Sequence, residues 1–361
     1  MSVDSSRFTP SRVRIVGSGL IGTSIGLALV QHGVNVEMLD SDSKSQSLAT
    51  DLVGGVQGGI EIQPELVIFA VPTGQLDLVL KREFDLNPNS TFMDVGSVKN
   101  EVVLKVETIP GLSAKFVPTH PMAGREIGGA SAARADLFVG RSWIITPTSS
   151  TNQQSIQIVE DLITLMGASF VKLSAIDHDA AVAKISHLPQ IVSSLLAKQL
   201  VGTSQEWMEL SGQGLRDSTR IAGSDEGLWR GIIFSNREAL SPLLNDFRTD
   251  LDKMIQSLED LGEIGKLLLQ GRKGRETIPG KHGGKAREYS YLPIVIDDKP
   301  GQLASIFIEC SSLGVNVEDL VIEHSPGQLS ALITLALSAV DAKKLSDHLA
   351  SMGWNVHPIR N

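Results

Sequence analysis

The stretch Arg12–Gly22, RVRIVGSGLIG, joins a short apolar segment directly to three glycines spaced as GxGxxG. Residues 12–16 are predicted to form a buried strand, and apolar positions at helical spacing over 20–30 predict a helix that ends at Gly33. In such a turn the first glycine permits the bend, the second lets the backbone approach a pyrophosphate, and the third packs helix on strand. The predicted cofactor-binding residues of this turn are Gly17, Ser18, Gly19, Leu20, Ile21 and Gly22.

A second predicted strand, 35–39, ends at Asp40, where a dinucleotide site places the acid that binds the adenine ribose. The alternative for Asp40 is a loop acid or a helix cap. Asp40 and Asp42 would repel a 2′-phosphate, and the only basic residue close by is Lys44. This pattern favours NAD over NADP.

Further strand and helix units follow, which predict an α/β fold with a doubly wound, mostly parallel sheet. The strand predicted over 66–71 closes on Pro72, and the strand predicted over 91–94 leads into Gly96 and Ser97. Ligands of such sheets bind beyond the carboxyl ends of the strands. Val71 and Pro72 are therefore added to the cofactor-binding residues. Strands over 143–146 and 169–173 complete this domain at about residue 174.

The stretch 115–129, KFVPTHPMAGREIGG, places a histidine between two prolines. Pro118 and Pro121 restrict the backbone, so His120 is expected in a stiff connection at the mouth of a strand. A general base needs such stiffness, and Glu126 is a second titratable group in the same loop. The alternative is that His120 is a turn residue satisfied by a backbone hydrogen bond.

Composition limits the classes of function. The 361 residues carry a formal net charge of −9 and 4% aromatic residues, which argues against nucleic-acid binding. The single cysteine, Cys310, fits a reducing cytoplasm, and neither a signal peptide nor a membrane-spanning apolar run is recognised. No metal site is predicted, because the eight histidines and one cysteine lack ligand spacing.

Residues 178–271 contain helical apolar patterns and no predicted strand. Pro189 should kink the first of these helices beside His187, which is either a substrate-binding residue or a core histidine. The glycine-rich segment 211–223 carries Arg216, Asp217 and Arg220. A guanidinium there would suit a carboxylate substrate. The apolar face over 240–258 predicts either a subunit interface or burial within one chain.

The last part of the chain begins with a composition break. Glycines and basic residues over 271–289 predict a flexible linker. After it, the pattern over 290–361 predicts a βαββαβ order, which is a ferredoxin-like α+β fold. Asp298-Lys-Pro-Gly301 is the expected first turn, 325–327 is the expected turn between the middle strands, and Cys310 is expected in the core.

The ordered motifs GSGLIG, DVGSVK, THPMAGRE, ISHLP and RDSTRIAGSDEGLW, spread over about 12–260, resemble the prephenate and arogenate dehydrogenases of tyrosine biosynthesis. The resemblance implies NAD-dependent oxidative decarboxylation of prephenate or arogenate by a homodimer. It makes His120 the base and Ser97 its partner in orienting the substrate hydroxyl. Residues implied in substrate binding are His187, Arg220, Glu126 and Asp217.

The segment 290–361 resembles an ACT domain, which motivates feedback control by tyrosine; the alternative is that the module only strengthens the dimer. The predicted division is therefore an NAD-binding Rossmann-type domain over 1–174, an all-helical dimerisation domain over 175–270, the linker, and a regulatory domain over 290–361.

Three alternatives stay open. Residue types alone do not separate prephenate from arogenate as substrate, and Arg125 departs from the small polar residue expected there. A β-hydroxyacid dehydrogenase would use a lysine on the long helix, and Lys184 is available. A non-catalytic sensor of NAD and an amino acid would keep the glycine turn and the last domain without needing His120.

Overall fold

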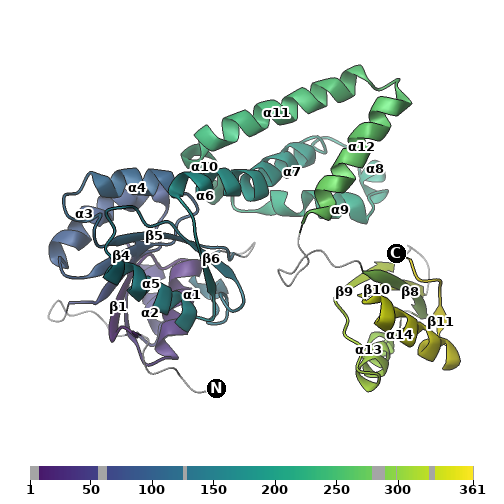
Figure 1. Ribbon diagram of the computed structural model, residues 1–361, viewed down its shortest axis with the longest axis horizontal. Helices are drawn as coiled ribbons and strands as arrows, with labels where there is room; N and C mark the ends of the chain where they lie inside the picture. The colour runs from purple at the N-terminus through teal and green to yellow at the C-terminus, as the bar shows by residue number, and fades with distance from the viewer. Residues whose placement is uncertain are drawn as a thin grey trace. The chain divides into compact units, whose positions relative to one another are not determined.

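The computed structural model describes residues 8–55, 63–124, 128–278, 289–297, 299–324 and 330–360. The chain divides into two compact units, Met1–Asp250 and Leu251–Asn361. Figure 1 shows the order of the helices and strands along the chain. Within the described residues no helix is both long enough and apolar enough to cross a membrane.

The first unit is built on a seven-stranded sheet with the order β2-β1-β3-β4-β5-β6-β7. Strands β1 to β5 are parallel, β6 runs antiparallel to β5, and β7 is parallel to β6. The order reverses at β1, which puts a ligand crevice at the carboxyl ends of the central strands. The strands are β1 (Arg12–Val16), β2 (Asn35–Leu39), β3 (Leu66–Phe69), β4 (Thr91–Asp94), β5 (Phe116–Pro121), β6 (Ser142–Ile145) and β7 (Ser169–Lys172).

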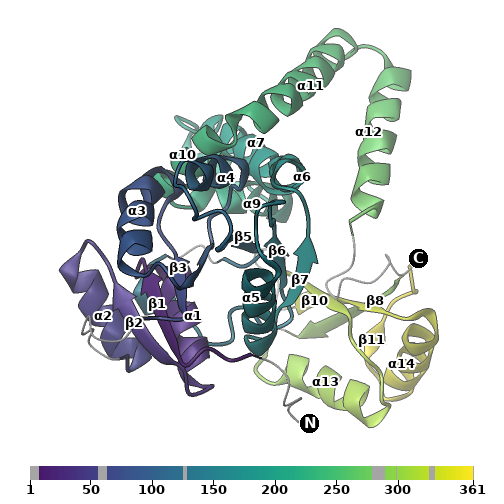
Figure 2. The ribbon, with the colours of Figure 1, turned by 60° about the vertical axis from the view of Figure 1, so that its left-hand side comes forward.

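Helices cover both faces of this sheet, as Figure 2 shows. One apolar core lies between the sheet and helices α1 (Leu20–Val30), α2 (Ser43–Val53) and α5 (Gln153–Leu165). The other lies under α3 (Leu76–Leu86) and α4 (Asn100–Glu107). Because both faces are covered, central strands such as β3 are buried along their whole length and are apolar throughout. The predicted doubly wound α/β fold is confirmed.

The chain then becomes helical. The elements are α6 (Ala175–Val182), a π-helical turn η3 (Ala183–His187), α7 (Leu188–Lys198), α8 (Gln205–Glu209), α9 (Gln213–Thr219), a 3-10 turn η4 (Arg220–Gly223), α10 (Glu226–Ser235), α11 (Arg237–Gln256) and α12 (Leu261–Glu276). The irregularity expected beside Pro189 takes the form of the π turn. Proline has no N–H to donate to the preceding turn, so α7 begins anew with the proline in its first turn.

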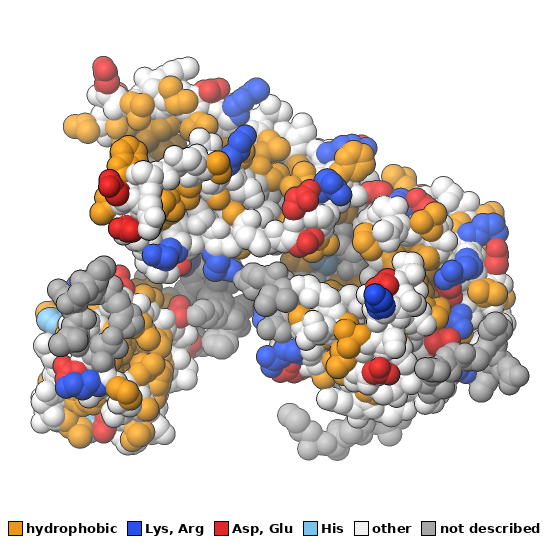
Figure 3. Space-filling view, turned by 180° about the vertical axis from the view of Figure 1, so that it is seen from behind, with side chains coloured by type: hydrophobic (Ala, Val, Ile, Leu, Met, Phe, Trp, Pro, Cys, Tyr) orange, Lys and Arg blue, Asp and Glu red, His pale blue; other side chains and the backbone are white. Residues whose placement is uncertain are grey.

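Large apolar side chains are exposed on the helical part of the first unit. Figure 3 shows such side chains in orange on the helical region at the upper left. The most exposed of them are Val201, Leu210, Trp207 and Ile176. Apolar surface of this extent is typical of a subunit interface.

The second unit contains a four-stranded antiparallel sheet in the order β11-β8-β10-β9. Its elements are β8 (Ser290–Asp297), α13 (Gln302–Ser312), β9 (Asp319–His324), β10 (Ser330–Leu337), α14 (Ala339–Ser351) and β11 (Asn355–Val356). The predicted βαββαβ order is confirmed. Cys310 lies in the core of this unit, where burial raises the pKa of its thiol.

Two details differ from the sequence-based expectations. His120 lies inside β5 and not in a connection, because Thr119, His120 and Pro121 pair with β6 from the neighbouring edge. Residues 271–276, predicted as linker, form the last turns of α12, which an Arg272–Glu276 ion pair at 3.2 Å supports. Within the first unit, α6 contacts α4 and α10 contacts the short helix η1 (Thr73–Gln75).

Several predicted features fall outside the described residues. They are Arg125 and Glu126 of the histidine loop, Asp298 of the first turn in the C-terminal unit, the turn at 325–327, and residues 279–288 of the predicted linker.

Candidate active site

The glycine turn after β1 is shaped by two close backbone approaches. Gly17 has φ of +111°, and a Cβ there would overlap the carbonyl oxygen of Ala70 at the end of β3. A Cβ on Gly22 would overlap the carbonyl oxygen of Gly17 and so push α1 away from the turn. These two glycines are therefore required by the fold itself.

Gly19 differs from its neighbours in the same turn. It is exposed, its φ is negative, and no described atom lies within 4 Å of the position that its Cβ would take. Gly19 is also the N-cap of α1, and no side chain caps the helix there. The unpaired N–H groups of a helix amino terminus bind anions such as a pyrophosphate. The open space above Gly19 is thus suited to a dinucleotide.

Two polar side chains flank this space. The hydroxyl of Ser18 is buried and has no hydrogen-bond partner within the described part of the chain. Asp40, at the end of β2, accepts hydrogen bonds from the backbone N–H of Ser18 at 2.7 Å and of Asp42 at 2.9 Å. Asp42, and not Asp40, caps α2. A carboxylate has further lone pairs, so Asp40 can hold the turn and still accept from a ribose hydroxyl.

Val71 and Pro72 lie between β3 and the short helix η1 (Thr73–Gln75). Val71 is partly buried against the core under α3, whereas Pro72 is exposed at the amino end of η1. Leu20 and Ile21 are partly buried in the first turn of α1. The predicted cofactor-binding residues therefore gather at the carboxyl ends of β1, β2 and β3.

His120 is partly buried near the end of β5, where its ring contacts the ring of His178 from α6. The ring centroids are 5.1 Å apart at an interplanar angle of 72°, and the two rings share a hydrogen bond of 2.9 Å between Nδ1 of His120 and Nε2 of His178. Burial, followed by the nearby His178, Lys99 and His187, holds the pKa of His120 well below its usual range. His120 is therefore neutral at pH 7, which is the form that accepts a proton.

A buried ion pair supports the backbone on which His120 is carried. Lys99, which is completely buried, contacts the carboxylate of Asp94 at the end of β4. Its ammonium group also donates to the carbonyl oxygen of Thr119 at 2.7 Å. Asp94 in turn accepts from the backbone N–H groups of Gly96 and Thr119. This network fixes β5 to the connection after β4, where the partly buried Ser97 lies.

His187, at the end of the π turn, is almost completely buried. Burial lowers the pKa of His187 to about 4. The amide Nδ2 of Asn236 lies 2.9 Å from its Nδ1 and 2.9 Å from the backbone oxygen of Asp179. A carbonyl oxygen can only accept, so the amide nitrogen must point this way and Nδ1 of His187 must accept as well. The ring hydrogen of His187 is therefore on Nε2, where it is available as a donor.

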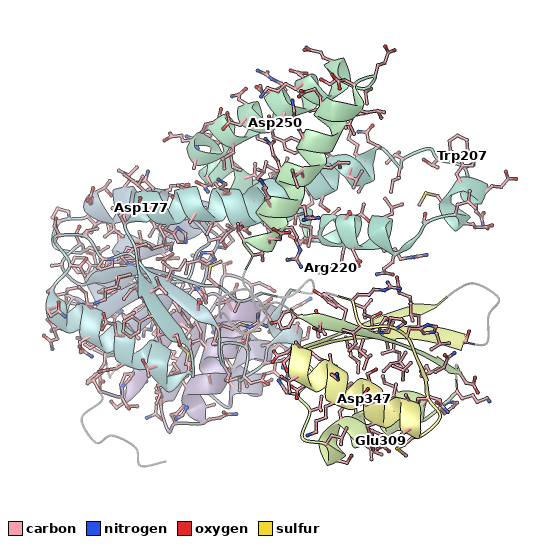
Figure 4. All side chains as sticks on the ribbon, turned by 45° about the vertical axis from the view of Figure 1, so that its right-hand side comes forward. Asp177, Trp207, Arg220, Asp250, Glu309 and Asp347 are labelled. Carbon is pink, nitrogen blue, oxygen red and sulfur yellow. The ribbon has the colours of Figure 1, made fainter. Side chains whose placement is uncertain are left out.

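The predicted carboxylate-binding segment is fixed to helix α7. Gln190 Nε2 donates to the carbonyl oxygen of Ile221 at 2.9 Å, and Ser193 Oγ donates to that of Ser218 at 2.8 Å. Arg220, labelled in Figure 4, is exposed at the start of η4. Asp217 is exposed and accepts from Gln213 at 2.7 Å. The turn that carries Arg220 is thus held against the helix that begins directly after His187.

Four residues of this site were absent from the sequence-based set: Lys99, His178, Asp179 and Asn236. The adjacent His178-Asp179 pair is a local signal that sequence reading could have used. Asn236 gives no such signal, because it approaches His187 only through the packing of α10 on the rest of the unit. Among the described residues no group of three or more histidine, cysteine or acidic side chains is arranged to hold a metal.

Two family models match this chain. The family model described as prephenate dehydrogenase, nucleotide-binding domain, matches residues 25–172, and the one described as prephenate dehydrogenase, dimerization domain, matches residues 174–267. The prephenate dehydrogenase of Bacillus subtilis is 25% identical over 350 residues, which are 93% of this chain and 94% of that protein. The cyclohexadienyl dehydrogenase of Zymomonas mobilis is 30% identical over 256 residues, which are 67% of this chain and 86% of that protein.

Solved structures show the same relationship. Prephenate dehydrogenase from Aquifex aeolicus, in complex with hydroxyphenyl propionate and NAD+, is 27% identical, has a TM-score of 0.66, and covers 74% of this chain and 98% of its own. The arogenate dehydrogenase of Synechocystis is 26% identical with a TM-score of 0.63, and covers 74% of this chain and 99% of its own.

Proposed function

The chain belongs to the prephenate dehydrogenase family, and we propose that His120 is the base in its NAD-dependent oxidative decarboxylation of prephenate to 4-hydroxyphenylpyruvate. One observation carries this assignment. His120 is a neutral imidazole held by a second ring at the carboxyl end of β5, on the edge of the sheet where the cofactor-binding residues gather.

The reaction requires a base, groups that bind carboxylates, and a hydride acceptor. The substrate ring loses a hydride from the carbon that bears its hydroxyl, the hydroxyl loses a proton, and the ring carboxylate leaves as CO2, so that the ring becomes aromatic. NAD supplies the hydride acceptor when it is bound. Gly17 to Gly22 and Asp40 fit this cofactor, because they provide an open helix terminus and a ribose acceptor.

Each remaining residue supplies one interaction. The ring nitrogen of neutral His120 that carries no hydrogen takes the proton of the substrate hydroxyl. Ser97, in the connection that follows β4, orients that hydroxyl. His187 donates its Nε2 hydrogen to the substrate. Arg220 binds a carboxylate through its guanidinium fork, and Asp217 supports the same turn. Glu126 remains a prediction for the side-chain end of the substrate.

The rival assignments are weaker. A β-hydroxyacid dehydrogenase needs a lysine directed into the site, but Lys184 is exposed three residues before the buried His187. The lysine buried beneath the site, Lys99, is paired with Asp94. A sensor without catalytic activity gives no reason for the buried hydrogen bonds that hold His120.

The test is NADH absorbance with prephenate and arogenate offered separately. Wild-type protein should reduce NAD with prephenate, and His120→Asn should lower kcat by roughly 10²–10⁴-fold, the usual contribution of a general base. The affinity of His120→Asn for NAD should stay within threefold of wild type. Reduction with arogenate alone would move the assignment to arogenate dehydrogenase. Equal turnover by His120→Asn would remove His120 from the role of base.

We also propose the domain organisation and its regulation. The exposed apolar side chains of the helical domain support a homodimer, which light scattering should detect.

The strand order β11-β8-β10-β9 supports an ACT domain over 290–361 that binds tyrosine. Tyrosine should inhibit the full chain but not a chain ending at Ile278, just after α12. Equal inhibition of both would exclude this role. A single cysteine supports a cytoplasmic enzyme, which cell fractionation would check.

A further inference from the structure

A row of three hydrogen-bonded side chains ends on His120. Asp179 Oδ1 lies 2.7 Å from Nδ1 of His178, and Nε2 of His178 lies 2.9 Å from Nδ1 of His120. His178 is completely buried, and Asp179 is 5% exposed. The row therefore runs from a buried carboxylate on α6 to the ring of His120 on β5.

The donors around Asp179 fix where the hydrogens of this row lie. Its two oxygens also accept from the backbone N–H groups of Lys99 and Asn100, each at 2.8 Å. A carboxylate surrounded by donors accepts from the histidine too, so the hydrogen is on Nδ1 of His178. In a neutral ring, Nε2 of His178 is then an acceptor. The hydrogen between the two rings consequently belongs to Nδ1 of His120, and Nε2 of His120 is left bare.

We propose that His178 and Asp179 are positioning residues that hold His120 in the tautomer with a bare Nε2 and stabilise the imidazolium that forms there. This rests on the proposed role of His120 as the base. The proton leaves the substrate hydroxyl and binds Nε2 of His120. The new positive charge is shared with His178 through the Nδ1 hydrogen and is balanced by Asp179. No electron is exchanged with these side chains.

Helix capping alone does not account for the row. The two oxygens of Asp179 suffice to bind the first N–H groups of α4 (Asn100–Glu107) without any histidine. An imidazole buried as deeply as His178 loses its hydration, and it is tolerated because both of its nitrogens are hydrogen-bonded. One of those bonds goes to His120.

The charged groups near His120 show why a carboxylate must balance the positive charge of a protonated His120. Lys99 lies beneath β5 with its ammonium on the carbonyl of Thr119, and His187 approaches from the π turn. Lys99 and Asp94 on β4 form a buried ion pair, so the carboxylate of Asp94 is already engaged. Asp179 is then the negative charge that reaches His120 through a hydrogen-bonded path.

The kinetic test uses three variants and one control. His178→Phe keeps a ring but has no acceptor for His120, and kcat should fall by about 10²-fold or more while KM for prephenate and NAD changes by less than about threefold. His178→Gln offers an amide oxygen to the same hydrogen and should recover part of the rate. The control is Asp177→Asn, an exposed carboxylate on α6 labelled in Figure 4, which should leave kcat unchanged.

The third variant, Asp179→Asn, separates positioning from capping. Loss of the negative charge makes a protonated His120 less stable, so the pKa of His120 falls and the acid limb of the kcat profile moves to lower pH. Loss of the α4 cap alone would lower the melting temperature and leave that limb in place. An unmoved acid limb would overturn the proposal.

Ring-¹⁵N histidine labelling reads the tautomer without any turnover. The signals of His120 are identified by their loss in His120→Asn, and in wild type they should show a protonated Nδ1 and a bare Nε2. A hydrogen on Nε2, or a His178→Phe enzyme within threefold of wild-type kcat, would overturn the proposal. A wild-type protein that reduces no NAD with prephenate would refute the proposed function, while the spectrum would still decide the tautomer. If His178→Phe does not fold, His178→Gln and the wild-type spectrum decide the question.

Discussion

Replacing Gly19 by alanine should weaken NAD binding without disturbing the fold. A methyl group at this position meets no described atom within 4 Å, and the φ of −76° suits any residue. Alanine is a poorer N-cap than glycine by up to about 1 kcal/mol, but it also restricts the unfolded chain, which contributes roughly 0.4–1 kcal/mol in the opposite direction. The free energy of unfolding should therefore change by less than about 1 kcal/mol.

The effect on the cofactor should be much larger. The new methyl group would occupy the space into which the pyrophosphate must come to meet the first N–H groups of α1. Losing one hydrogen bond to a charged group costs about 1.5–3 kcal/mol, which corresponds to a rise of roughly 10- to 150-fold in Kd. Titration calorimetry with NAD measures this rise, and thermal unfolding of the same sample measures the fold.

Gly22→Ala is the matched control, because its methyl group would overlap the carbonyl oxygen of Gly17. Overpacking of this kind costs roughly 1–3 kcal/mol, and each kcal/mol lowers the melting temperature by about 2–4 °C in a unit of this size. Gly19→Ala should therefore lose affinity for NAD and keep its melting temperature, whereas Gly22→Ala should have a lower melting temperature. A Gly19→Ala protein that binds NAD within threefold of wild type would show that the dinucleotide does not approach Gly19.

Three further predictions concern the substrate side. Asn236→Leu leaves the carbonyl of Asp179 and Nδ1 of His187 buried without a donor, so it should destabilise the first unit by roughly 2–4 kcal/mol in thermal unfolding and raise KM for prephenate. Because the pKa of His187 is about 4 when folded and 6.5 when unfolded, the unfolded chain binds more protons between these values. The contribution of neutral His187 to the free energy of unfolding is therefore fully present above pH 6.5 and is lost as the pH drops toward 4, by roughly 3 kcal/mol at most. Chemical unfolding of His187→Gln at several pH values should lack this part of the pH dependence. Arg220→Gln should raise KM for prephenate by roughly 10- to 100-fold in NADH assays with little change in melting temperature, whereas Arg216→Gln, also exposed, should not.

The parts of the fold that depend on local pattern were predictable. The strands at 12–16, 35–39 and 91–94 were predicted at the residues where they occur, because apolar runs bounded by turn residues specify buried parallel strands. The glycine turn was predictable for the same reason, since Gly22 is required by the carbonyl oxygen of Gly17 in the same turn and Gly17 by the end of the neighbouring strand.

The environment of His120 depends on pairings between distant segments, and sequence reading missed it. His120 was expected in a connection because two prolines flank it. Instead, β6 pairs antiparallel with residues 119–121, so that β5 continues through His120. His178 lies 58 residues from His120 in the chain, and Asn236 lies 49 residues from His187. No local pattern specifies contacts at such separations. The motif that contains Lys99 was recognised, but its burial under β5 was not.

The π turn at Ala183–His187 has a consequence for how the two buried histidines of this long helix are presented. His178 and His187 are nine residues apart, and in an unbroken α-helix nine steps of about 100° would place them roughly 180° apart, on opposite sides. A π turn absorbs one extra residue, which leaves about eight effective steps and brings the two rings to within roughly 80°. It allows a single helix to supply both the ring that contacts His120 and the ring proposed to donate to the substrate.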